Sequence, residues 1–198
     1  MSSRNTRTGE TEMTAQHTDT LPPSQESDEA DRKQLEMAKA EGAKYKESLN
    51  YMVSEVAHTG GSKRAGDYIV AFAQEEAEGM YVFNEGALEW RDPGEENCHI
   101  EVAVLDATDQ RFIPGLTIHV TVRATDGGQV ASFQAPFLWH PGLYHYGRNI
   151  QVPGDGTYDL QIHIEAPTFM RHDWVNGKRF AEPVTVAFEN IEIKTGQD

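Results

Sequence analysis

Residues 98–104 read CHIEVAV, and the interpretation of the whole chain starts from this stretch. Every second side chain from Cys98 to Val104 is apolar, whereas His99 and Glu101 occupy positions between them. Side chains in a β-strand alternate between the two faces of a sheet, so this period predicts a strand with one face in a core. Cys98 shares the apolar positions, and we expect it to pack as a small hydrophobe rather than act as a nucleophile.

Similar alternation recurs from residue 66 to residue 196 and predicts about seven strands. The sequence Asp126-Gly127-Gly128 predicts a hairpin turn, and a change of parity after Phe188 predicts a bulge near Glu189-Asn190. Short strands separated by turns, with no helices between them, are typical of two antiparallel sheets packed face to face. We therefore predict an all-β domain over residues 66–196, an immunoglobulin-like antiparallel β-sandwich, with an open barrel as the alternative.

An amphipathic helix is expected over residues 31–58, ahead of the strands. Its apolar residues recur at steps of three and four, which places them on one stripe. Asp31 with Gln34 resembles a capping box, and Gly60-Gly61 ends the pattern. The stripe predicts packing on the protein's own domain or, because its spacing is close to a heptad, pairing with a second copy in a homodimer.

The composition excludes several classes of protein. Lys+Arg 17 against Asp+Glu 32 gives a formal net charge of -15, which repels phosphate backbones, so no nucleic-acid partner is expected. Such an acidic chain suits a halophilic host, where salt screens its self-repulsion. No stretch is long and apolar enough for a membrane span. Residues 1–30 are expected to be an acidic, disordered tail without the apolar run of a signal peptide, so the chain as written is predicted to be cytoplasmic.

His99 and Glu101 are the first candidates for binding chemistry. They project from one face of the strand about 7 Å apart along it, so that an imidazole and a carboxylate can reach a common ion. The same spacing recurs at His163 and Glu165, and His119 also takes the polar parity of its strand. Such a pair is also typical of the polar face of a half-exposed strand, so spacing alone does not identify a metal site.

Two aromatic, turn-rich segments carry further histidines. Residues 137–149 include His140 and His145, and residues 168–174 include His172. Loops at the end of a sandwich are a common place for function. In the alternative interpretation the domain is an interaction or carbohydrate-binding module without a metal site, whose contact surface is formed by Trp139, Tyr144, Tyr146 and Trp174. The sequence holds no GxSxG elbow, Walker loop, GxGxxG or HExxH motif, and we predict that the protein is not an enzyme.

Four segments in this order resemble the periplasmic iron-transport (Fe2+ transport) protein family. They are His99-Ile100-Glu101, residues 113–118 (IPGLTI), residues 145–149 (HYGRN), and residues 158–167 (YDLQIHIEAP) followed by Arg171-His172. The resemblance implies a non-catalytic protein that binds a divalent metal of the iron or copper type and is linked to iron uptake or metal transfer. It also implies an iron permease as partner, a homodimer, and a periplasmic rather than a cytoplasmic location.

By position, the resemblance implies four metal ligands, which are His99, Glu101, His145 and His172. The family's methionine seven residues before the loop histidine, and its aspartate three before it, correspond here to Leu138 and Gly142. Two expected ligands are therefore missing, and His140 and Met170 are candidates to replace them. Without a thioether, imidazole and carboxylate donors suit Cu2+, Fe2+ or Zn2+, with Cu2+ bound most tightly. The hypothesis requires that the fold bring side chains from separate segments around one point.

Overall fold

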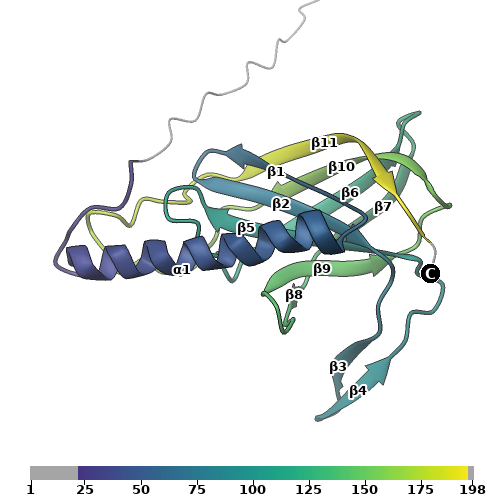
Figure 1. Ribbon diagram of the computed structural model, residues 1–198, viewed down its shortest axis with the longest axis horizontal. Coiled ribbons are helices and arrows are strands. Elements are labelled where there is room, and N and C mark those ends of the chain that lie inside the picture. Colours follow the sequence, from purple (N-terminus) through teal and green to yellow (C-terminus); the bar gives the residue numbers. More distant parts are fainter. Residues whose placement is uncertain (1–21, 196–198) are drawn as a thin grey trace, which may run out of the picture.

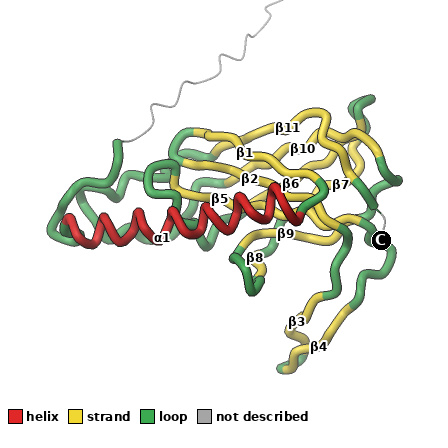
Figure 2. Tube along the Cα trace, in the orientation of Figure 1, coloured by secondary structure: helices red, strands yellow, loops and turns green. Residues whose placement is uncertain are grey.

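The computed structural model describes residues 22–195. Residues 1–21 of the predicted tail therefore lie outside the described residues, and residues 22–30 form no helix or strand. The Gln25 N–H donates to Asn176 Oδ1 at 2.9 Å, and the Ser27 hydroxyl donates to Asp173 Oδ2 at 2.8 Å. These bonds hold the end of the predicted tail against the long loop before the last strand, beside which it runs in Figure 2.

The chain folds into two antiparallel sheets that enclose one core, with a helix ahead of them (Figure 1). The five-stranded sheet has the order β1-β2-β5-β9-β8, made of Thr59–Ala65, Tyr68–Glu75, Cys98–Asp106, His145–Ile150 and Phe137–Leu138. The four-stranded sheet has the order β11-β10-β6-β7, made of Val184–Ile193, Gly156–Ile164, Ile118–Ala124 and Gln129–Gln134. The predicted fold class, an all-β immunoglobulin-like sandwich with an N-terminal α-helix, is confirmed.

The core uses the alternation from which the fold was predicted. Ile100 and Val104 of β5 are fully buried, in one cluster with Leu160 and Ile162 of the facing sheet. Cys98 points into the same core, where burial raises the pKa of its thiol to about 12. A thiol with so high a pKa is not ionised at neutral pH, which agrees with its predicted role as a packing residue.

The described residues contain four strands that the sequence pattern did not predict, so the predicted number of about seven strands is too low. β1 reads TGGSKRA, where small and polar residues give no alternation, so the first sheet begins at Thr59 rather than at residue 66. β8 and β9 lie in the segment expected to be a loop. β4, Ala87–Arg91, pairs with β3, Met80–Asn84, in a hairpin that protrudes from the sandwich in Figure 1.

Both predicted irregularities are confirmed. The pairing of β10 with β11 shifts register so that Glu189-Asn190 together face Asp159. Asn190 has a φ of 56°, and its N–H donates to Asp159 Oδ1 at 2.9 Å. The hairpin turn at residues 126–128 joins β6 to β7, with Gly127 at a φ of 87°.

The N-terminal helix begins at the predicted cap. α1, Arg32–Tyr51, starts after Asp31, whose side chain accepts from the Gln34 N–H while the Gln34 side chain accepts from the Asp31 N–H. A π-helical turn, η1 Met52–Val56, continues the helix. No helix within residues 22–195 is long and apolar enough to cross a membrane.

The helix covers the outer face of the five-stranded sheet. Leu49 and Met52 are buried in a second apolar cluster together with Ala73 of β2 and Ala103 of β5. The apolar stripe thus packs on the protein's own sheet, which was the first of the two predicted roles. Pairing of this helix with a second copy stays a prediction.

Gly42 is the point where α1 meets the loop after β5. A Cβ at this position would lie 1.9 Å from the Asp109 carbonyl oxygen, which is far inside contact distance. Alanine stabilises an unobstructed helix over glycine by about 1 kcal/mol, whereas overpacking costs about 1–3 kcal/mol. We expect Gly42→Ala to lower the free energy of unfolding, measured by urea denaturation. Lys39→Ala, on the exposed side of the helix, should leave it nearly unchanged; a gain in stability from Gly42→Ala would contradict the close contact.

Candidate metal centre

Three side chains converge on the outer face of the five-stranded sheet: His99 and Glu101 from β5 and His145 from β9. Each offers a ligand atom, and these atoms all lie within 4.8 Å of one another. From Glu101 Oε1, the distance is 3.2 Å to His145 Nε2 and 3.9 Å to His99 Nε2. Nitrogen and oxygen donors bind Zn2+ at about 2.0–2.2 Å, so one ion placed among the three atoms is within reach of small side-chain rotations.

The register of β5 and β9 produces this convergence. Glu101 pairs with Gly147, so His145, two residues away on β9, faces it diagonally on the same side of the sheet. Gly147 has no side chain, and a Cβ there would lie 2.9 Å from His99 Nε2. The glycine of the HYGRN segment therefore leaves the space that the His99 imidazole fills.

The helix and the loop between β8 and β9 close over the centre. His99, Glu101 and His145 are all buried, and His99 is not exposed at all. Leu143 of the loop packs in the same cluster as Leu49 and Met52 of α1 and η1. The Tyr45 hydroxyl of α1 donates to the Tyr144 carbonyl, which ties helix and loop together. The centre is thus shielded from bulk water.

Asn149 fixes the tautomer of His99. Its Nδ2 donates to the Glu78 carbonyl at 2.7 Å, which leaves Oδ1 to face His99 Nδ1 at 2.8 Å. An amide oxygen only accepts hydrogen bonds, so Nδ1 carries the proton and Nε2 keeps its lone pair. His99 Nε2 is buried and has no hydrogen-bond partner among the described residues. Its lone pair is therefore available to bind a metal ion.

Burial lowers the charge of the centre. Burial, and then the nearby carboxylates of Glu75 and Glu78, raise the pKa of Glu101 to about 8. Burial, and then the neighbouring His99 ring, lower the pKa of His145 to about 4. At neutral pH the centre therefore holds a protonated carboxyl and neutral imidazoles. A divalent cation supplies the charge that favours the carboxylate, so the donor set fits such an ion.

The structure does not bring His172 to the other three predicted ligands. Its side chain is 92% exposed in the loop before β11, and Nδ1 lies 3.0 Å from Glu29 Oε2. Met170, a candidate replacement ligand, is 98% exposed in the same loop. The other replacement candidate, His140, is close to the centre, with its ring centroid 6.0 Å from that of His145.

The two positions where the resemblance expects further ligands lie beside the centre. Leu138 of β8 pairs with His145, so an apolar side chain stands next to the imidazole. Gly142 donates its N–H to His140 Nδ1 at 3.0 Å. Sequence patterns did not indicate Asn149, Glu75 or Glu78. Asn149 was missed because the HYGRN segment was expected to be a loop. A strand there would have placed Asn149 on the face of His145.

The aromatic residues do not form one exposed platform. Tyr146 is buried, accepting from the Leu116 N–H at 3.0 Å and donating to the Ile113 carbonyl at 2.9 Å, so its predicted role on a contact surface is wrong. Trp139 and Trp174 are exposed on separate loops.

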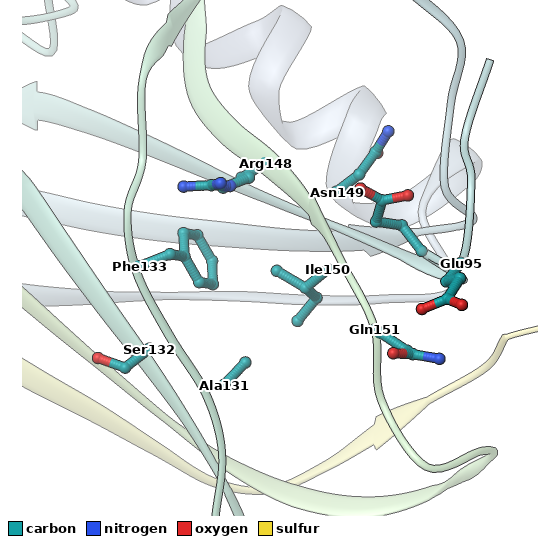
Figure 3. Close-up of a pocket in the computed structure, with 9 residues that line it drawn as sticks. Glu95, Ala131, Ser132, Phe133, Arg148, Asn149, Ile150 and Gln151 are labelled. Atoms are coloured by element: carbon teal, nitrogen blue, oxygen red, sulfur yellow. The ribbon is translucent and has the colours of Figure 1, made fainter. Parts of the chain in front are cut away.

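A cleft of about 570 Å³ opens between β7 and β9, where Phe133 and Ile150 lie among polar side chains (Figure 3). None of the predicted ligands lines this cleft.

The sequence matches the family model described as Fe2+ transport protein over residues 82–193. This range includes all three side chains of the centre and leaves α1, β1 and β2 outside. No curated protein matches the sequence.

Solved structures share the fold. FetP of a uropathogenic Escherichia coli strain, recombinantly expressed in the periplasm, is 23% identical with a TM-score of 0.56, covering 67% of this chain and 93% of that chain. Copper-reconstituted P19 from Campylobacter jejuni is 18% identical with a TM-score of 0.58, covering 70% of this chain and 96% of that chain. A copper-bound P19 variant with methionine replaced by isoleucine is 20% identical with a TM-score of 0.54, covering 67% and 92%.

The buried carboxyl predicts an unusual pH dependence of stability in metal-free protein. The pKa of Glu101 is about 8 when folded against an ordinary 4.5, so folding disfavours ionisation and stability falls as pH rises between these values. Glutamine cannot ionise, so we expect Glu101→Gln to raise the free energy of unfolding at pH 8 by about 4 kcal/mol, and to have little effect at pH 4.5.

Urea denaturation of chelator-treated protein at pH 4.5, 6.5 and 8 measures this difference. His145 acts in the opposite sense, because its lowered pKa removes stability as pH falls from 6.5 toward about 4. Because His145 Nε2 lies 3.2 Å from Glu101 Oε1, the substitution also changes the surroundings of His145, so the comparison at pH 6.5 and 8, well above the pKa of His145, is the one that reports on the carboxyl. Parallel pH profiles for the parent and Glu101→Gln would show that the carboxyl is not buried as described.

Proposed function

Since this chain belongs to the Fe2+ transport protein family, we propose that it is a non-catalytic carrier of a divalent transition-metal ion, held by His99, Glu101 and His145. The ion is the cargo of the protein. It is taken up at the outer face of the five-stranded sheet and passed on during iron uptake or metal transfer.

One observation carries this proposal. Two imidazoles and a carboxyl group from adjacent strands lie within 4.8 Å of one another in a buried position. Buried polar groups in folded proteins are usually satisfied by hydrogen bonds, yet His99 Nε2 has no such partner within residues 22–195. An ion bound there satisfies this lone pair and stabilises the carboxylate form of Glu101.

The donor set determines which ions fit. Imidazole and carboxylate suit Cu2+, Fe2+ and Zn2+, and the usual affinity order puts Cu2+ first. The solved P19 structures contain copper, including one variant in which isoleucine replaces a methionine.

We place the transfer step outside the cytoplasm, with an iron permease as the partner and a homodimer as the working unit. The location is supported by FetP, which was expressed in the periplasm.

His172 is left outside the proposed ligand set, because its exposed ring contacts Glu29. The alternative module without a metal site is less well supported, since Tyr146 belongs to the core.

Removal of His145 tests the centre directly. We expect His145→Ala to lower the affinity of the tightest site for Cu2+ and Zn2+ by more than about 100-fold, since it removes a ligand rather than an outer partner. Isothermal titration of untagged, chelator-treated protein in competition with a chelator of known affinity measures this. His172→Ala is the matched control and should bind as the parent does. Equal affinity of the parent and His145→Ala would remove the centre from consideration.

Asn149 gives a second, independent test. Asn149→Ala removes the acceptor for the His99 Nδ1–H, and we expect a loss of Zn2+ affinity of about 10–100-fold. Asn149→Asp keeps an oxygen acceptor at this position, so its loss should be smaller. If both variants bind Zn2+ as tightly as the parent, Asn149 does not orient His99 for the ion.

A further inference from the structure

A second group of potential metal ligands lies on the other outer face of the sandwich. β10 pairs with β6 so that His163 directly faces His119, and the two ring centroids are 6.2 Å apart. His119 Nε2 lies 2.8 Å from Oε1 of Glu165, which follows β10 directly, two residues after His163. The His119 and Glu165 side chains are 44% and 53% exposed. Two imidazoles and a carboxylate thus lie side by side on a partly exposed sheet surface.

Thr185 of β11 orients the second imidazole. Its Oγ1 lies 2.8 Å from His163 Nδ1, and β11 pairs Thr185 with His163 in register. When Nδ1 carries the proton and donates it to this hydroxyl, Nε2 of His163 keeps its lone pair. Among the described residues, the other close imidazole pairs both include His145 of the buried centre. Paired imidazoles are therefore confined to two places on this part of the chain.

We propose that His119, His163 and Glu165 form a second, surface-exposed site for a borderline divalent ion such as Cu2+, Zn2+ or Ni2+. Facing residues of an antiparallel pair have Cβ atoms about 4.5–5.5 Å apart, which lets two imidazole nitrogens bind one ion after rotation of the rings. The carboxylate of Glu165 exchanges its contact with His119 for a bond to the ion. The formal net charge of -15 raises the local concentration of cations at such a surface.

The surface site differs from the buried centre in affinity and exchange. Its rings are partly exposed and rotate before they bind, whereas the ligand atoms of the buried centre already lie within 4.8 Å of one another. Water fills the remaining coordination positions and leaves them open to a competing ligand. Binding here is therefore weaker and exchanges faster, as suits a site that collects ions and releases them.

Titration with Cu2+ alone separates the two sites. The untagged, chelator-treated full chain should show a tight and a weaker class of binding by isothermal titration. In a His119→Ala, His163→Ala double variant we expect the weaker class to lose at least tenfold in affinity while the tight class is unchanged. In His145→Ala we expect the converse. Failure of the surface site and failure of the buried centre thus give different results.

A control and a positional measurement complete the test. Gln161→Ala changes a non-ligating side chain on the same strand and should leave both classes as in the parent. In the His145→Ala variant, substoichiometric Cu2+ should broaden amide NMR signals of β6, β10 and β11 before those of β5 and β9. A weaker class that survives the double variant, or broadening that begins elsewhere, overturns the proposal.

Discussion

The contact between α1 and the five-stranded sheet is the constraint on which the candidate centre depends. A sheet face that carries two histidines and a glutamate is normally solvated, because burying such groups is costly. Here Leu49 and Met52 pack on Ala73 and Ala103, and the small alanine side chains allow the helix to approach the strands. Burial of apolar area stabilises this contact by about 25 cal/mol per Å². The helix α1, which buries the centre, lies outside the residues that match the family model.

Strand parity predicted one half of the centre and missed the other. His99 and Glu101 follow from the alternation in β5, because apolar residues on one face leave the polar pair on the opposite face. His145 was predicted as a ligand from a family resemblance, but its strand was not predicted, since HYGRN holds a glycine and three charged or polar residues without an apolar period. Sequence also cannot reveal that Asn149 meets His99, because that contact depends on the β5 and β9 register.

Two pairs with the same spacing show how tertiary context separates equivalent sequence patterns. His99 with Glu101 and His163 with Glu165 each enclose one isoleucine, which points into the core in both strands. The first pair is buried because α1 covers its sheet. The second pair stays partly exposed on the four-stranded sheet. Spacing therefore identifies a pair of donors, whereas the element packed above them decides how firmly an ion is held.

Burial also explains how the centre tolerates the absence of an ion. A carboxylate held beside Glu75 and Glu78 in a low-dielectric site would repel them, and the raised pKa of Glu101 means that a proton neutralises it instead. In the proposed carrier, an arriving divalent ion displaces this proton and binds the lone pair of His99, so that the neutral, protonated carboxyl becomes a carboxylate paired with the ion. The fold thus keeps the donors in place at low charge until the cation supplies the missing attraction.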